Sequence, residues 1–118
     1  MTHRATRFRW DEIALEKVTD MVSRKTVSGD AITLVQLYYK KGACVPLHGP
    51  DTERLVYLLQ GVVRFIIDGE ELILREGEVL VLPAGTVRQA ECLDDTFLML
   101  VSAAGSLSPR PEGAPPAP

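Results

Sequence analysis

The segment between Gly42 and Glu91 limits the possible folds more than any other part of the sequence. In its middle, the stretch from Val62 to Leu74 places apolar runs on both sides of an Asp68-Gly69 pair. Such a pair between apolar runs is typical of a β-hairpin, because Gly accepts the positive φ angle that the turn requires. This segment is therefore predicted to form antiparallel strands.

Short runs rich in β-branched, leucine and aromatic residues continue on both sides of the hairpin, separated by turn signals. The predicted strands are residues 22–27, 32–39, 54–59, 79–82, 87–92 and 96–102. In the second of these, Val35, Leu37 and Tyr39 share one face, and Gln36 and Tyr38 lie on the other. No helical segments alternate with the strands, so the pattern predicts an all-β sandwich or barrel and excludes a parallel α/β fold.

The 118 residues are enough for one domain. Residues 22–102 are predicted to form the barrel, and residues 1–21 an N-terminal segment. Residues 103–118 contain mainly Ala, Gly, Pro and Ser. Such a tail buries too little apolar surface to offset the entropy lost on ordering, and we expect it to be disordered.

Charge and composition exclude several classes of partner. The net charge is −3, and no basic excess favours a nucleic-acid surface. The sequence has no apolar signal-peptide core and no run long enough to cross a membrane. A cytoplasmic protein without membrane or nucleic-acid partners is therefore expected, with Cys44 and Cys92 as buried free thiols rather than a disulfide.

The glycines and one proline of the central segment resemble the two sequence motifs of the cupin family. The matching residues are Gly42, His48 and Gly61 in the first motif and Gly77, Pro83 and Gly85 in the second. The pattern is similar to that of small single-domain cupins of the uronate-ketoisomerase and quercetinase-like kind. The resemblance implies a double-stranded β-helix, also called a jelly-roll barrel.

Cupins of this kind hold a divalent metal through two histidines, a glutamate and a third histidine. The resemblance places His48 at the first of these positions, but Pro50, Arg54 and Arg88 at the other three. A single imidazole does not hold a transition metal against water, because useful sites need three or four ligands. We therefore expect no metal and no cofactor. The alternative is that Glu53, Asp51 or a cysteine rebuilds a metal site.

The replacements suggest a metal-independent enzyme of isomerase, cyclase or lyase type. Two guanidinium groups bring about the charge of one divalent ion and suit carboxylates, phosphates and enolates. Arg54 and Arg88 are predicted to bind an anionic or enolisable substrate, with His48 as the catalytic acid or base. Further substrate-binding candidates are Tyr38, Leu98 and Leu100.

Structural alternatives stay open for the same residues. Arg54 could pair with Glu53 or Asp51 at the rim, and Arg88 with Glu91 outside the pocket. His48 could be a hydrogen-bonded core residue, and Tyr38 a core or interface residue. The chain could also be a ligand-binding or dimerisation module without catalysis.

A homodimer is expected because the outer side of the barrel is also apolar. In the first strand of the hairpin, Val62 and Ile66 lie on the face opposite Val63, Phe65 and Ile67. Such faces and the sheet edges need covering. We expect the N-terminal segment to be docked or exchanged between the two copies.

Overall fold

The computed structural model describes residues 5–45, 52–86 and 88–104, which form two antiparallel β-sheets. The larger sheet contains, in spatial order, β1 (Glu16–Lys17), β2 (Val22–Ser28), β3 (Ile32–Tyr39), β10 (Thr96–Ala103), β5 (Arg54–Gln60) and β8 (Val79–Leu82). The smaller sheet contains β4 (Cys44–Val45), β9 (Arg88–Cys92), β6 (Val62–Ile67) and β7 (Glu70–Arg75). The described part of the chain has one short 3-10 turn, η1 (Trp10–Glu12), and no α-helix, so the predicted all-β class is confirmed.

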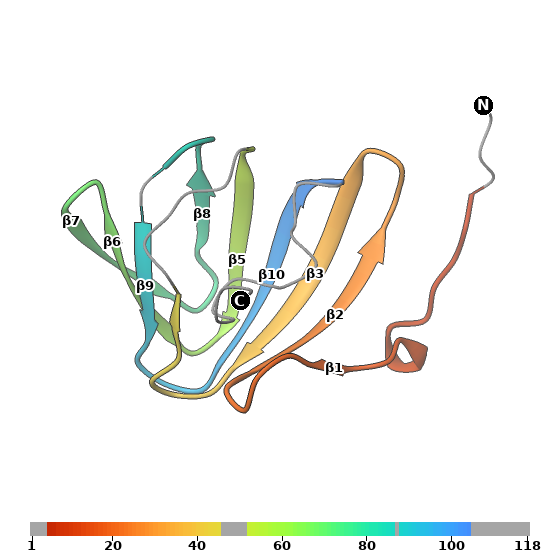
Figure 1. Ribbon diagram of the computed structural model, residues 1–118, viewed down its shortest axis with the longest axis horizontal. Helices are drawn as coiled ribbons and strands as arrows, with labels where there is room; N and C mark the ends of the chain where they lie inside the picture. The colour runs from red at the N-terminus through yellow and green to blue at the C-terminus, as the bar shows by residue number, and fades with distance from the viewer. Residues whose placement is uncertain (1–4, 46–51, 87, 105–118) are drawn as a thin grey trace, which may run out of the picture.

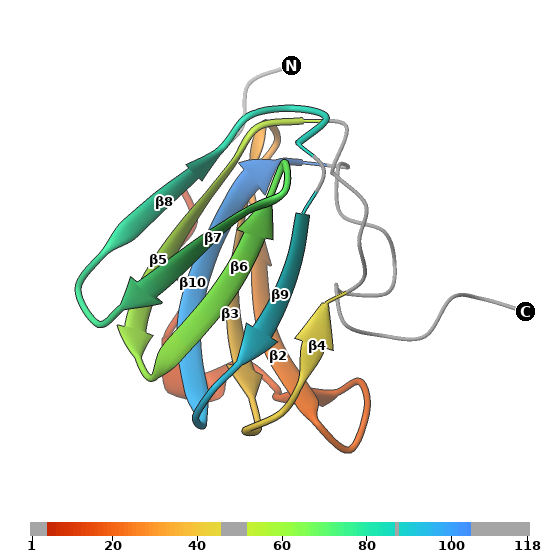
Figure 2. The same cartoon turned by 90° about the vertical axis from the view of Figure 1, so that its left-hand side faces the viewer.

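The two sheets face each other, as Figures 1 and 2 show. Their inner faces form one apolar core, because side chains alternate between the two faces of each strand. The core residues from the larger sheet are Val22, Val35, Leu37, Tyr39, Val56, Leu58, Leu82, Leu98 and Leu100. Val63, Phe65, Leu74, Ala90 and Cys92 come from the smaller sheet. The core is thus shared between strands far apart in the sequence.

The predicted hairpin is present as β6 and β7. Ile67 pairs with Glu70 beside the turn, and Val62 pairs with Arg75 at the open end. Both turn residues have positive φ angles, 50° at Asp68 and 85° at Gly69. This is the backbone that a two-residue hairpin with right-handed twist requires, and it explains why this pair fixed the register.

The other strand predictions agree with the structure to within one or two residues at their ends. Val87, which was predicted to begin a strand, lies outside the described residues. In β3 the predicted alternation is confirmed, since Val35, Leu37 and Tyr39 are buried in the core. Gln36 and Tyr38 lie on the outer face of the same strand.

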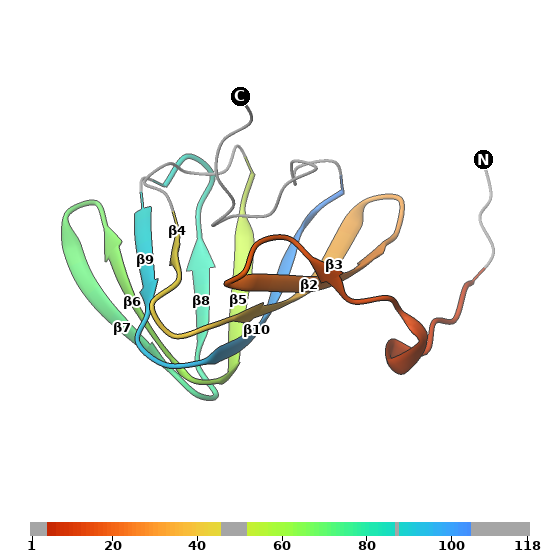
Figure 3. The same cartoon turned by 60° about the horizontal axis from the view of Figure 1, so that its bottom comes forward.

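The N-terminal segment joins the larger sheet at its edge. Glu16 pairs with Arg24, so β1 extends the sheet beyond β2. The indole nitrogen of Trp10 donates a hydrogen bond to the Gln36 Oε1 atom, and Lys25 donates one from Nζ to the Trp10 carbonyl oxygen at 3.0 Å. Trp10 therefore rests on the outer face of β2 and β3, while the stretch before it runs away from the sheet (Figures 1 and 3).

The predicted state of the two cysteines is correct in one respect and wrong in another. Both are free thiols, but Cys44 is exposed and only Cys92 is buried. Cys44 pairs with Glu91 in the short edge strand β4, and paired residues point to the same side of a sheet. Cys44 thus shares the outer face with Glu91, whereas Cys92 points into the core.

No helix in the described part of the chain has the length and apolar character that crossing a membrane requires. Of the predicted disordered tail, residues 105–118 lie outside the described residues.

Candidate functional site

Two buried arginines mark one end of the molecule. Strands β5 and β9 begin at this end and strands β8 and β10 finish there (Figure 1). We call it the loop end, because the connections β4–β5 and β8–β9 cross it. Arg54 is the first residue of β5, and Arg88 is the first residue of β9. The two sheets therefore each contribute one arginine to the same end of the space between them.

Arg88 enters the core directly after a tight turn. The Thr86 backbone N–H donates to the Pro83 carbonyl oxygen at 3.2 Å, and its hydroxyl donates to the same oxygen at 2.6 Å. Gly85 has a φ angle of 77°, which the third position of a type II turn requires. The turn delivers Arg88 to the inner face of the smaller sheet, where the residue is 2% exposed.

Arg54 reaches the inner face of the larger sheet in the same way. It is 5% exposed, while its chain neighbours Glu53 and Leu55 are exposed on the other side. The alternation of a strand thus separates Arg54 from Glu53 and disfavours their predicted pairing. Pairing of Arg88 with Glu91 is disfavoured for the same reason.

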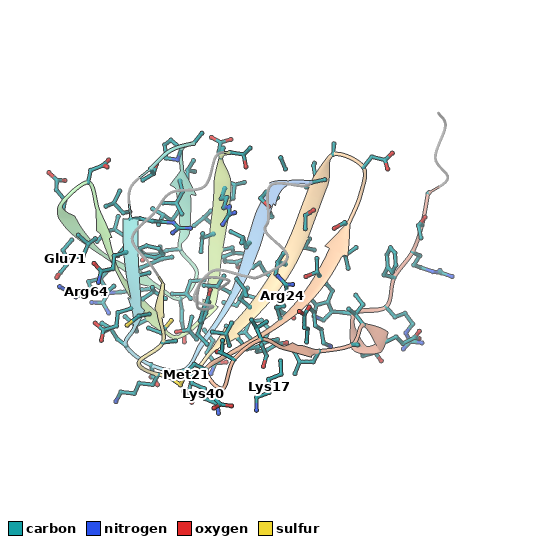
Figure 4. The ribbon with its side chains drawn as sticks, viewed as in Figure 1. Lys17, Met21, Arg24, Lys40, Arg64 and Glu71 are labelled. Atoms are coloured by element: carbon teal, nitrogen blue, oxygen red, sulfur yellow. The ribbon has the colours of Figure 1, made fainter. Side chains whose placement is uncertain are left out.

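Glu91 instead lies on the outer face of the smaller sheet. Its carboxylate is 3.7 Å from a guanidinium nitrogen of Arg64. Arg64 is closer still to Glu71, at 2.8 Å, and Figure 4 shows these two side chains together on the outer side of the sheet. The rim ion pairs therefore belong to Arg64 and not to Arg88.

A row of small polar residues surrounds Arg54 on the inner face. The pairs Ser28 with Thr33, Thr33 with Ser102, and Ser102 with Arg54 form one continuous row across β2, β3, β10 and β5. The hydroxyls of Ser28 and Thr33 are 3.2 Å apart. Ser102 is 4% exposed, and its hydroxyl oxygen has no hydrogen-bond partner within the described residues.

Sequence reasoning missed Thr33 and Ser102. The signal was present, because each hydroxyl residue stands at an inward position of a strand whose other inward positions are apolar. A buried hydroxyl without a partner is costly, so the row is a polar lining rather than part of the packed core.

Below the loop end the space between the sheets is nearly filled. A cavity of about 30 Å³ remains, and its lining includes Arg88, Cys92, Leu98 and Leu100. Such a volume holds about two water molecules. Leu98 and Leu100 thus line the interior as expected, but room for a substrate must come from the loop end.

Tyr38 does not lie in this interior. Its ring meets that of Phe97 edge to face, with centroids 4.6 Å apart, and its hydroxyl donates to Gln36 Oε1 at 2.9 Å. Both partners belong to the outer face of the larger sheet. The structure therefore separates Tyr38 from the other substrate-binding candidates, because it follows the buried Leu37 in an alternating strand.

Arg24 is a further arginine on the inner side, at the sheet edge. It pairs with Leu37, which is in the core, and its guanidinium group accepts a neighbour in Glu16, with nitrogen–oxygen distances of 3.1 and 3.2 Å. This ion pair fastens β1 to β2, so Arg24 has a structural task. His48, Pro50 and Asp51 lie outside the described residues.

The sequence profile of the cupin domain family matches residues 36–103, which is more than half of the chain. The chain belongs to the cupin family. A search of curated protein sequences gives no significant match.

Solved cupin structures have the same fold. KdgF from Halomonas sp. has a TM-score of 0.76 and 24% identity, and the similarity covers 83% of this chain and 94% of that one. An RmlC-like cupin from Shewanella frigidimarina has a TM-score of 0.77 and 17% identity, over 87% and 94% of the two chains. An oxalate decarboxylase variant from B. subtilis has a TM-score of 0.74 and 20% identity, over 92% of this chain and 32% of that one. At these identities the similarity concerns the fold.

The cupin motifs raise the question of a metal, and the residues present do not fit one. Two of the four motif positions hold arginines, whose guanidinium groups have donors only and no lone pair for a cation. Burial raises the pKa of the Cys92 thiol to about 11, which disfavours the thiolate form that binds metals. Across residues 5–45, 52–86 and 88–104, no three His, Cys, Asp or Glu side chains form a metal-binding group.

Proposed function

We propose that this cupin is a metal-independent enzyme of isomerase, cyclase or lyase type, acting on a small anionic or enolisable molecule at the loop end. The observation that supports this proposal is the burial of Arg54 and Arg88 on facing sheets at one end of the core. Both side chains also interact with other groups of the chain, so a ligand would join an existing polar network.

The chemistry follows from the donor set. Each guanidinium presents a planar fork of N–H donors that matches a carboxylate or an enolate. In a partly desolvated site such donors stabilise negative charge that develops on a carbonyl oxygen. The hydroxyl of Ser102 lies beside Arg54 and adds a hydrogen-bonding group at the same place.

In this proposal His48 moves the proton. It takes a proton from a carbon next to the carbonyl or carboxylate group and returns it to another atom of the same substrate. Arg54 and Arg88 hold the enolate that exists between the two transfers. The sequence motif carries the assignment of His48, since the residue itself lies outside the described part of the chain. Tyr38 has no part in this scheme.

The proposal can be tested first by binding. Small carboxylates, 2-oxo acids and inorganic phosphate are added to the protein at constant ionic strength, with chloride as the reference anion. A ligand that saturates the site should raise Tm by about 5 °C or more. Arg54→Met and Arg88→Met should abolish the shift, and the control Arg64→Met, on the outer face, should keep it. A panel in which no anion gives a shift would contradict the proposal.

Catalysis is tested separately on any anion that binds. In heavy water, proton NMR should show loss of the signal from the carbon-bound proton, and His48→Gln should stop this exchange. Binding without exchange would favour a ligand-binding module instead of an enzyme. A stoichiometric metal in protein purified without chelator would favour a metal-dependent cupin with atypical ligands.

A further inference from the structure

A band of exposed apolar side chains lies on the outer face of the larger sheet. Its members, which are between 37% and 60% exposed, are Ile32, Leu55, Tyr57, Leu59, Val79 and Val81. We call this band the outer patch. Together they expose roughly 600 Å² of apolar surface, which is the upper end of the range for patches on monomeric proteins.

The strand register joins the outer patch into a flat surface. Leu34, Val101, Leu55 and Val81 form one row across β3, β10, β5 and β8. Gln36, Met99, Tyr57 and Val79 form the next row. Neither row contains a charged residue, so nothing on it opposes the approach of an identical surface although each chain has a net charge of −3.

The chain covers only one side of this face by itself. Trp10 rests against Gln36 and is held there by Lys25, which covers the β2–β3 side. The β5–β8 side keeps its exposed valines at positions 79 and 81, and β8 is the edge strand of the sheet. The cover for this side must therefore come from outside residues 5–45, 52–86 and 88–104.

We propose that a second copy of this chain covers the outer patch, so that two larger sheets pack face to face across a twofold axis. A twofold axis brings the same patch of both copies together, which a flat apolar surface without charges allows. Sheets packed in this way lie about 10 Å apart and interdigitate their side chains. The outer patch supplies most of the roughly 800 Å² per partner that a stable interface of standard size buries.

The C-terminal tail is the competing occupant within the same chain. It follows Ala103 at the end of β10, close to the outer patch. Between residues 105 and 118, however, Leu107 is the only large apolar residue in the sequence. The tail thus has too little apolar surface to match six exposed side chains, and the second copy is the better partner.

The test is the mass of the full-length chain in solution, by analytical ultracentrifugation over a range of concentrations. The wild-type chain should sediment with twice the monomer mass of 13.0 kDa. Tyr57→Glu and Val79→Glu should each raise the dissociation constant by about 100-fold or more, because the twofold axis places two new carboxylates in an apolar interface. Both sites are exposed in the single chain, so the variants should keep the wild-type circular dichroism spectrum.

Two controls separate this proposal from its competitors. Leu93→Glu changes an apolar residue that is 39% exposed but lies outside the outer patch, and it should leave the dimer intact. Deletion of residues 105–118 should also leave it intact. A wild-type chain that is monomeric at every concentration would overturn the proposal. So would dissociation caused equally by Leu93→Glu, or a dimer that survives both patch variants.

Discussion

The outer face of the smaller sheet carries charged pairs, whereas the outer face of the larger sheet carries exposed valine, leucine and tyrosine side chains. On the smaller sheet, Arg64 contacts Glu71 and Glu91, and the hydrogen bond with Glu71 raises the pKa of Arg64. On the larger sheet, Tyr57 and Val79 stand side by side in a row without charges. The comparison teaches that one sheet is finished for water and the other for a partner.

The inner faces show no such difference, since both are apolar and closely packed except at the loop end. There the two sheets each add one buried arginine, and the larger sheet adds a row of hydroxyls. The same strands therefore serve the core, the proposed anion site and the proposed interface, at different positions along their length and on different faces.

The largest effect should come from the inner face of the larger sheet. Leu58 is fully buried and Leu55, on the same strand, is 39% exposed. Leu58→Ala should lower the free energy of unfolding by about 3 kcal/mol, because it removes packed atoms and leaves a cavity. Urea denaturation of a dilute sample measures this change.

Leu55→Ala is the matched control on the outer face. In dilute protein it should cost less than about 1 kcal/mol, as surface substitutions do. Its cost should grow with protein concentration if the outer patch is covered by a second copy. Equal costs for the two leucines at high dilution would break the distinction between the faces.

Thiol reactivity should give the next largest effect, on the two faces of the smaller sheet. Cys44 is exposed and Cys92 is buried with a pKa raised from 9.0 to about 11. The thiolate is the reactive form, so near pH 8 Cys92 should react about 100-fold more slowly on this ground alone. A disulfide reagent should show one fast and one slow thiol, with Cys44→Ser removing the fast phase.

The raised pKa of Cys92 also has a consequence for stability. A pKa above the unfolded value means that the folded state holds the proton more tightly. The contribution is complete below pH 9.0 and is lost as the pH rises towards about 11. Two thiols that react at the same rate in the native protein would contradict the placement of Cys92.

The smallest effect is expected for the ion pairs on the outer face of the smaller sheet. Arg64→Met removes the contacts with Glu71 and Glu91, which are exposed and screened by salt. Its effect on unfolding should be far below that of Leu58→Ala and should vanish in high salt. A large loss that persists in salt would show that this face is not simply a solvated surface.

Much of the fold could be predicted because its signals are local. The Asp68-Gly69 turn fixes a hairpin register within a few residues, and alternation in β3 separates Leu37 from Tyr38. The glycines and the proline of the two motifs gave the cupin fold, which the family profile confirms. The burial of Arg54 and Arg88 could also be anticipated, because the motifs place them where other cupins have inward-pointing side chains.

Several features of the site could not be predicted from local signals. Tyr38 was expected to bind substrate, and Cys44 was expected to be buried, although both face outwards. Alternation says which residues share a face but not which face is covered when both are apolar. Thr33 and Ser102 meet Arg54 only through the pairing of β3, β10 and β5, which the sequence does not display.

The sequence by itself determined the strands, the hairpin turn and the absence of a complete metal-binding set in the cupin motifs, because turn chemistry, alternation and residue type are properties of neighbouring residues. Only the tertiary structure decided that Arg54 and Arg88 meet at one end from opposite sheets, and that the outer patch stays bare while Trp10 covers its neighbour. These facts depend on how distant strands pair and stack. Long-range pairing is set by the burial of the whole core, and no short stretch of the chain contains that information.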